Sequence, residues 1–185
     1  AFLFLENGVP IRPVGFCNVN EMLEINTEQA DAIEVLRGTG TALYGSNSVH
    51  GTINVLQDAP PELPPWQLGL DLGPDHYTRG RLVASHQGGT TGLGIKALYT
   101  HDGGWRDESG FDEGKLNATF TAGAGGRIPS RFDLAATKLE QQTAGFIPGK
   151  NAYRDPELSQ QNLNPEAYRN AQAVRITGLV QPQTS

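Results

Sequence analysis

The chain has 185 residues and a net charge of −6, which argues against a nucleic-acid partner because such a partner normally requires a basic face. Its 23 glycines and 12 prolines favour short strands and turns over long helices, and no apolar run of roughly 18 residues predicts a transmembrane helix. The single cysteine, Cys17, excludes an internal disulfide, and the four histidines lack metal-ligand spacing. We therefore assign no metal, no cofactor and no catalytic residue.

The first expected element is an apolar strand over residues 2–5, which ends in a turn where Gly8 supplies a positive φ. No basic region precedes this strand, so we interpret it as an internal strand rather than a signal peptide. A polar loop follows over residues 12–20. Asn18 and Asn26 are placed to cap a short helix near residues 21–25 and one turn near residues 27–30.

The central stretch, residues 31–56, has the pattern of a strand, a glycine-rich loop and a second strand. Its glycines require a positive φ or a close approach of two backbone segments; they are Gly38, Gly40, Gly45 and Gly51. A dinucleotide-binding loop is disfavoured, because the third glycine is replaced by Leu43 and no long helix can follow. A P-loop is excluded, because the required Gly-Lys-Ser/Thr sequence is absent.

Three motifs in this stretch resemble the signature of the plug domain of TonB-dependent outer-membrane receptors: Ile33-Glu34-Val35-Leu36-Arg37-Gly38, Ala42-Leu43-Tyr44-Gly45 and Gly51-Thr52-Ile53-Asn54. The resemblance implies that the plug turns are formed by Gly38, Tyr44, Gly45 and Gly51. It implies that Glu34 and Arg37 engage charges on the barrel wall and anchor the plug. It also implies that the loop at the plug apex contacts the ligand, and the residues in that loop are Arg12, Phe16, Asn18 and Asn20.

Residues 58–65 hold four prolines, which can neither pair at the centre of a sheet nor form a helix, so this segment is interpreted as a linker. Beyond it, apolar residues recur at every second position, the period of a β-strand with two different faces. This pattern predicts six strands, near residues 66–72, 77–86, 93–100, 115–122, 132–137 and 173–180.

Soluble antiparallel sandwiches also alternate, so the connections between strands are informative. The connections at 87–91 and 122–126 are short and rich in glycine, whereas those at 101–114 and 140–170 are long and polar. Short periplasmic turns and long external loops are typical of an outer-membrane barrel, although the connection at 73–76 is short where a long one is expected. The acidic residues near 102–113 lack the glycine of a calcium-binding EF-hand loop, so a solvated loop is expected.

The predicted fold class is a mixed α/β plug segment followed by antiparallel up-and-down strands of a transmembrane β-barrel. We assign residues 1–57 to the C-terminal part of the plug domain, 58–65 to the linker and 66–185 to the N-terminal part of the barrel. A plugged transporter barrel has about 22 strands, so six strands indicate a fragment.

The resemblance implies a non-enzymatic receptor in the bacterial outer membrane that takes up a scarce ligand. Energy would come from a TonB-type coupling protein, whose contact segment is absent from this sequence, and outer-membrane lipid would surround the barrel. A ferric siderophore is the expected small-molecule ligand, with cobalamin, haem or oligosaccharide as other candidates. The alternative is a passive outer-membrane barrel or adhesin without energised transport.

Overall fold

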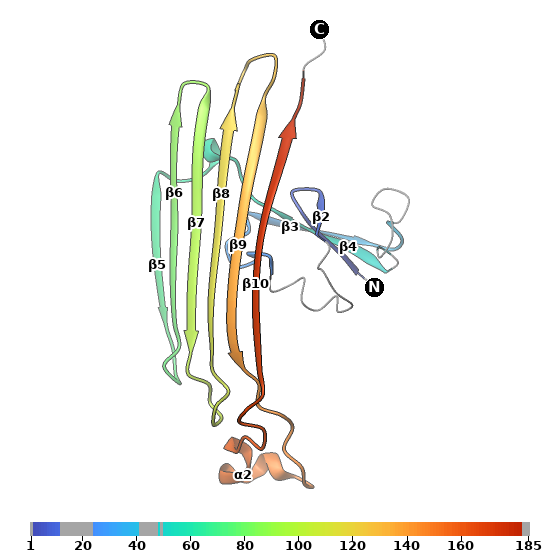
Figure 1. Cartoon of the computed structure of the whole chain (residues 1–185), viewed down its shortest axis with the longest axis vertical. Coiled ribbons are helices and arrows are strands. Elements are labelled where there is room, and N and C mark those ends of the chain that lie inside the picture. The colour runs from blue at the N-terminus through green and yellow to red at the C-terminus, as the bar shows by residue number, and fades with distance from the viewer. Residues whose placement is uncertain (1, 12–23, 41–47, 49, 183–185) are drawn as a thin grey trace.

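The computed structural model describes residues 2–11, 24–40, 48 and 50–182, which are mainly β-strands (Figure 1). The first four strands form a sheet of order β2-β1-β4-β3, which we call the short sheet. In it, β1 is parallel to β4, and the other pairs are antiparallel. Its strands are β1 (Phe2–Glu6), β2 (Val9–Ile11), β3 (Ala32–Arg37) and β4 (Gly51–Leu56).

A small apolar core stabilises the short sheet. Ile11, Ile25 and Val55 are buried together, and alternate residues of β1, Leu3 and Leu5, are also buried. By contrast, all six residues of the edge strand β3 are exposed. We refer to the described residues 2–62 as the N-terminal unit.

The remaining six strands form a meander, the long sheet, in which each strand is antiparallel to the next along the chain. Several strands extend beyond the expected ranges, because their ends continue the backbone ladder without continuing the apolar pattern. The strands are β5 (Trp66–Leu72), β6 (Thr78–Gly88), β7 (Thr91–Asp102), β8 (Phe111–Ala122), β9 (Ser130–Gln142) and β10 (Tyr168–Val180).

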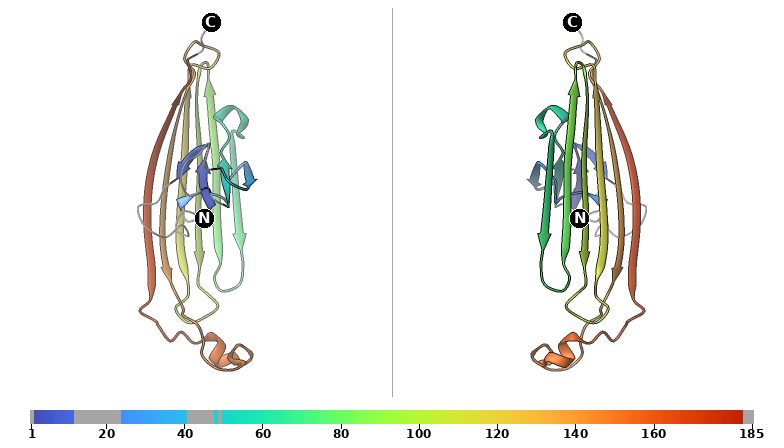
Figure 2. Two further views of the ribbon diagram at one scale, coloured as in Figure 1. Left: turned by 90° about the vertical axis from the view of Figure 1, so that its right-hand side faces the viewer. Right: turned by 90° about the vertical axis from the view of Figure 1, so that its left-hand side faces the viewer.

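The two faces of the long sheet differ in chemistry. Apolar residues of all six strands lie on one face, and a single cross-strand row consists of Leu68, Leu82, Ala97, Leu116, Ala136 and Val174. This face is strongly exposed, as the 72% exposure of Trp66 illustrates. The opposite face carries polar and charged residues and contacts the N-terminal unit, which lies beside the middle of the long sheet (Figures 1 and 2).

The connections contain short helical turns that the sequence patterns did not indicate. In the linker, Pro60–Glu62 forms the 3₁₀-helix η2, so the expectation that its prolines exclude a helix is wrong. Proline is tolerated in a first helical turn because its missing N–H would have no partner there. The loop between β9 and β10 holds η3 (Ala152–Arg154) and α2 (Pro156–Gln160). Among the described residues, no helix is long and apolar enough to cross a membrane.

The predicted helix near residues 21–25 lies largely outside the described residues. The predicted turn at 27–30 is present, and the side chain of Asn26 accepts a hydrogen bond from the backbone N–H of Gln29 at 3.2 Å. This cap places Glu28 and Asp31 at the start of β3, next to the polar face of the long sheet.

Candidate functional site

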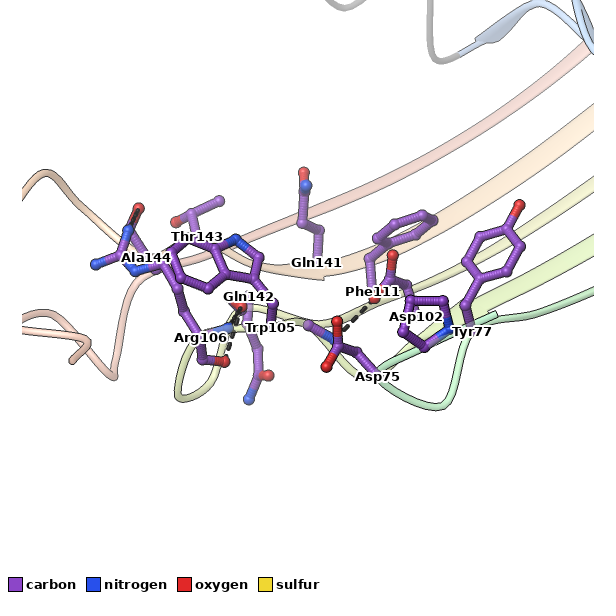
Figure 3. A pocket seen from close by; sticks show the side chains of 13 residues that line it. Asp75, Tyr77, Asp102, Trp105, Arg106, Phe111, Gln141, Gln142, Thr143 and Ala144 are labelled. Atoms are coloured by element: carbon purple, nitrogen blue, oxygen red, sulfur yellow. Dashed lines mark hydrogen bonds between the residues drawn. The ribbon is translucent and has the colours of Figure 1, made fainter. Parts of the chain in front are cut away.

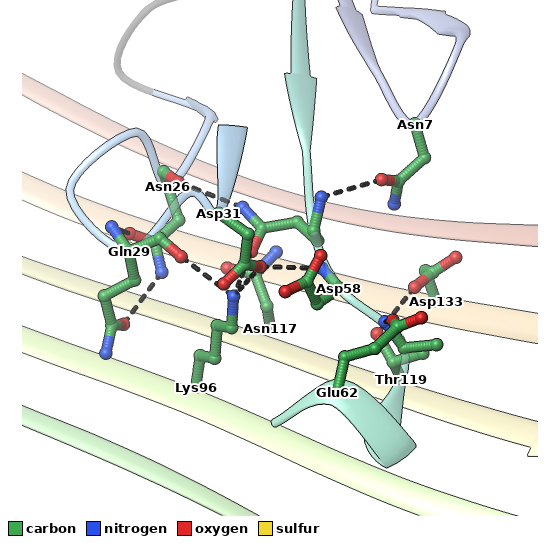
Figure 4. A network of polar contacts seen from close by, with 12 residues as sticks. Asn7, Asn26, Gln29, Asp31, Asp58, Glu62, Lys96, Asn117, Thr119 and Asp133 are labelled. Atoms are coloured by element: carbon green, nitrogen blue, oxygen red, sulfur yellow. Dashed lines mark hydrogen bonds and ion pairs between the residues drawn. The ribbon is translucent and has the colours of Figure 1, made fainter. Parts of the chain in front are cut away.

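Buried and half-buried cations on the polar face of the long sheet contact the N-terminal unit. The first is Lys96 of β7, whose side chain is only 5% exposed and whose ammonium group forms an ion pair with Asp31 (Figure 4). The same ammonium group donates to the side-chain oxygen of Gln57 at 3.0 Å and to the backbone oxygen of Gln29 at 2.9 Å. Three oxygen acceptors therefore satisfy the three N–H groups of Lys96.

The second cation is Lys115 of β8, whose side chain is 3% exposed. Its ammonium group lies 3.0 Å from a carboxylate oxygen of Glu28 and 3.1 Å from one of Glu113. Burial alone would raise the pKa of Glu28, but the attraction of Lys115 and the hydrogen bonds to the carboxylate outweigh it, so the pKa is lowered overall. Glu28 is therefore ionised at neutral pH.

The third cation, Arg175 of β10, joins two separate segments of the N-terminal unit. One guanidinium nitrogen lies 2.9 Å from a carboxylate oxygen of Glu6 on β1 and donates to the backbone oxygen of Glu24 at 2.8 Å. The other nitrogen lies 3.4 Å from the carboxylate of Glu24. Glu6 also accepts a hydrogen bond from Asn117 of β8 at 3.2 Å.

The fourth cation, Arg131 of β9, is oriented by its neighbour Asp133, whose carboxylate it contacts at 2.8 to 3.0 Å. It donates to the backbone oxygen of Gln57 at 2.9 Å and so contacts the residue that precedes the linker. Beside it, partial burial and the negative charges of Asp31 and Glu62 raise the pKa of Asp58. Asp58, the first residue of the linker, therefore lies next to other negative charges.

These contacts have a consistent polarity, and we call them the charged contact. In the ion pairs between the two parts, the long sheet supplies the cations Lys96, Lys115 and Arg175, and the N-terminal unit supplies the acids Glu6, Glu24, Glu28 and Asp31. Arg131 also belongs to the charged contact, but it reaches the N-terminal unit only through the backbone oxygen of Gln57. Removing one partner of a buried ion pair commonly costs about 3 to 5 kcal/mol, because the other charge is left unpaired. The charged contact is thus suited to holding the N-terminal unit in place. The described part of the chain has no group of three or more acidic, histidine or cysteine side chains placed to bind a metal.

The predicted anchoring pair lies elsewhere. Glu34 and Arg37 are on the exposed edge strand β3, where Glu34 accepts a hydrogen bond from Asn54 at 2.9 Å. Within the described residues, no ion pair joins either of them to the long sheet. Their role as anchors therefore stays a prediction.

The described glycines of the motif have distinct constraints. Gly38 has a φ of +100°, in the region that favours glycine, and its N–H donates to the backbone oxygen of His50 at 3.2 Å. A Cβ added at Gly51 would lie 2.7 Å from the backbone oxygen of Leu36. The other predicted site residues lie outside the described residues; they are Arg12, Phe16, Asn18, Asn20, Tyr44 and Gly45.

Comparison with known families agrees with the motifs. Residues 1–52 match the model of the TonB-dependent Receptor Plug Domain, which confirms the resemblance for this part of the chain. A search of curated protein sequences finds no match.

Solved structures of similar fold include two receptors and a copper transporter. The ferric-catecholate import receptor Fiu from E. coli K12 matches with a TM-score of 0.66 at 18% identity over 78% of this chain and 21% of its own. The siderophore receptor PiuA from Acinetobacter baumannii matches with a TM-score of 0.63 at 17% identity over 82% of this chain and 21% of its own. The copper transporter OprC matches with a TM-score of 0.65 at 17% identity over 79% of this chain and 24% of its own.

The chain therefore spans about a fifth to a quarter of the length of these structures. The predicted fold class is confirmed: a plug segment is followed by an antiparallel sheet of six strands.

Proposed function

We propose that this chain is part of a TonB-dependent outer-membrane receptor that takes up a scarce ligand. Residues 1–57 would be the C-terminal part of the plug, 58–65 the linker, and 66–185 the first six strands of the barrel. The observation that carries the proposal is the charged contact, because it holds a segment with a plug-domain match against the polar face of a sheet whose opposite face is apolar.

The long sheet has the dimensions and the faces of a barrel wall. A strand that crosses an outer membrane needs about 9 to 11 residues, and the strands β6 to β10 have 11 to 13. The exposed apolar face would contact lipid, and the polar face would line the lumen in which the plug sits. This arrangement supports a location in the bacterial outer membrane.

The lengths of the connections indicate how the long sheet would be oriented in the membrane. The linker and the short turns at 89–90 and 123–129 lie at one end of the long sheet, and the loop that holds α2 lies at the other end (Figure 1). We assign the end with the short turns to the periplasm, where a TonB-type coupling protein would act on the plug. The loops at 73–77, 103–110 and 143–167 would then face the outside.

A ferric siderophore is the ligand that the comparisons favour, because Fiu and PiuA are described as receptors for such compounds. Copper is the main competitor, because OprC is described as a copper transporter. We retain Arg12, Phe16, Asn18 and Asn20 as proposed ligand contacts. We also retain Glu34 and Arg37 as proposed anchors, which would meet charged groups on wall strands other than the six of the long sheet.

The proposal is tested by producing the complete receptor in cells and measuring surface binding and growth on a panel of iron chelates, with a copper salt as a comparison. Phe16→Ala should weaken ligand binding, and Arg37→Ala should impair growth at normal surface levels. Arg127→Ala, in the exposed turn between β8 and β9, removes an arginine outside the motif and should leave growth unchanged. If only copper is bound, the ligand is wrong and the receptor class stands; if nothing is bound or taken up, the proposal fails.

A further inference from the structure

A second site lies at the proposed outer end of the long sheet, apart from the charged contact. It is a cavity of about 580 Å³, formed where the connections after β5, β7 and β9 meet (Figure 3). This volume lies within the range of about 300 to 1,000 Å³ that is typical of small-molecule sites. None of the residues of the charged contact lines it.

An arginine holds two of these loops together. One nitrogen of the Arg106 guanidinium donates to the backbone oxygen of Gly145 at 2.8 Å, and another donates to that of Gln161 at 2.6 Å. The backbone N–H of Asp107 donates to the backbone oxygen of Gln160 at 2.9 Å, next to the end of α2. The loop between β7 and β8 is thus fastened to the loop between β9 and β10, which gives the cavity a defined wall.

The lining combines aromatic rings with carboxylates. Tyr77, Trp105 and Phe111 line the cavity, and Trp105 is 57% exposed, so much of its ring system is accessible to a ligand. Arg79 already lies over the ring of Tyr77, with its guanidinium carbon 5.5 Å from the ring centre. Aromatic faces of this kind attract cations.

Two carboxylates are available beside these rings. Asp102 accepts a hydrogen bond from the backbone N–H of Gly104 at 2.8 Å, and the Asp75 carboxylate has no partner among the described residues. Arg106 is the cation in the lining, and backbone oxygens occupy its terminal nitrogens. The carboxylates are therefore not neutralised by an ion pair within the cavity.

We propose that this cavity binds a cationic ligand, with a protonated amine placed between Asp75, Asp102 and the face of Trp105. The inference rests on the proposed receptor function and narrows its ligand class. A carboxylate gains a charge-assisted hydrogen bond from such an amine, and the indole ring gains a cation–π contact. Among iron chelates, the site favours those with a free amine over anionic chelates.

The test uses the complete receptor and two probes that differ in one charge. The first is a ferric trihydroxamate that carries a primary amine, and the second is the same chelate with that amine acetylated. Loss of a hydrogen bond to a charged group corresponds to about tenfold or more in affinity, so the amine chelate should bind at least that much more tightly. Asp75→Asn combined with Asp102→Asn should abolish the difference. Asp107→Asn removes a charge from the loop that holds Trp105 but not from the cavity lining, and it should preserve the difference in affinity.

Trp105→Ala provides a second variant and should weaken binding of the amine chelate more than binding of the acetylated one. Equal affinity of the two chelates in the unaltered receptor would overturn the inference and leave the receptor function intact. Binding of an anionic ferric triscatecholate more tightly than the amine chelate would also overturn the inference and leave the receptor function intact. Failure to bind any iron chelate or copper would overturn the proposed function together with the inference.

Discussion

Lys96 of β7 and Asp31, the residue before β3, form an ion pair that joins the long sheet to the N-terminal unit. The carboxylate of Asp31 also accepts a hydrogen bond from the backbone N–H of Asp58 at 2.6 Å. A single carboxylate thus connects three parts of the chain: the segment before β3, the segment that begins at Asp58 and the long sheet. Replacing either partner should loosen the contacts among these three parts.

The first prediction concerns this pair. Lys96→Met leaves the Asp31 carboxylate without its counter-charge at a partly buried site, and the local opening free energy of residues 24–31 should fall by about 3 kcal/mol. Hydrogen exchange on the purified complete receptor measures this quantity. Asp31→Asn should cost less in the Lys96→Met background than alone, because the two changes share one interaction.

Lys138→Met is the matched control. Lys138 lies on the same sheet and pairs with Glu140 at 2.7 Å, but both side chains are more than half exposed. Such exposed pairs contribute at most about 1 kcal/mol, so the exchange of residues 24–31 should be unchanged. A similar loss of protection in both variants would show that charge removal anywhere on the sheet has this effect.

A second prediction concerns the geometry of Arg175. Its guanidinium reaches Glu6, the carboxylate of Glu24 and the backbone oxygen of Glu24 together. A lysine ammonium keeps the charge but lacks the fork that holds several acceptors at fixed angles. Arg175→Lys should therefore speed exchange at β1 and leave residues 28–31 protected. Unchanged exchange at β1 would show that the positive charge at position 175 is enough to protect β1 and that the forked shape of the guanidinium is not needed.

The third prediction is a dependence on pH. The lowered pKa of Glu28 means that its contribution to stability is present above its usual pKa of 4.5 and is lost as the pH falls through the lowered value in the folded protein. Glu28→Gln should therefore be less stable than the unaltered receptor at pH 7, and the difference should shrink in acid below pH 4.5. This difference in stability is measured by hydrogen exchange at each pH, corrected for the intrinsic exchange rates. A difference in stability that grows in acid would contradict the conclusion that the ionised form of Glu28 stabilises the folded protein.

The fourth prediction concerns close packing in the short sheet. The Cβ of a Gly51→Ala variant would lie 2.7 Å from the backbone oxygen of Leu36 and 3.0 Å from the ring of Phe2. Such overpacking costs about 1 to 3 kcal/mol of stability. Thermal unfolding of the plug, monitored by its susceptibility to proteolysis, should show this loss of stability. Gly114→Ala on β8 meets no atom within 4 Å and should be neutral, since no backbone or side chain must move.

The sequence predicted the elements better than their contacts. The alternation of apolar residues located all six strands of the long sheet. It underestimated the length of β9, because this strand continues to Gln142 through residues that do not alternate. The helix α2 was missed, because five residues are too few to show a helical period. Asp155 followed by Pro156 was the available signal, since the Asp155 side chain accepts from the N–H groups of Glu157 and Leu158.

The charged contact was not predicted, for a physical reason. Alternation placed Lys96 and Lys115 on the polar face of their strands, but it does not say which residue lies opposite that face. Asp31 is 65 residues from Lys96 along the chain, and only the folded structure brings them together. The lysines on the polar face of the strands were a usable signal, because a charge that becomes buried there requires a partner.

The most direct test of the account is the dependence of uptake on energy. Whole cells that produce the complete receptor would be given a radiolabelled ferric chelate, in strains with and without the inner-membrane coupling protein. The account predicts that surface binding is the same in both strains and that uptake falls to background when the coupling protein is absent. Equal uptake in both strains would contradict the account and identify a passive outer-membrane barrel.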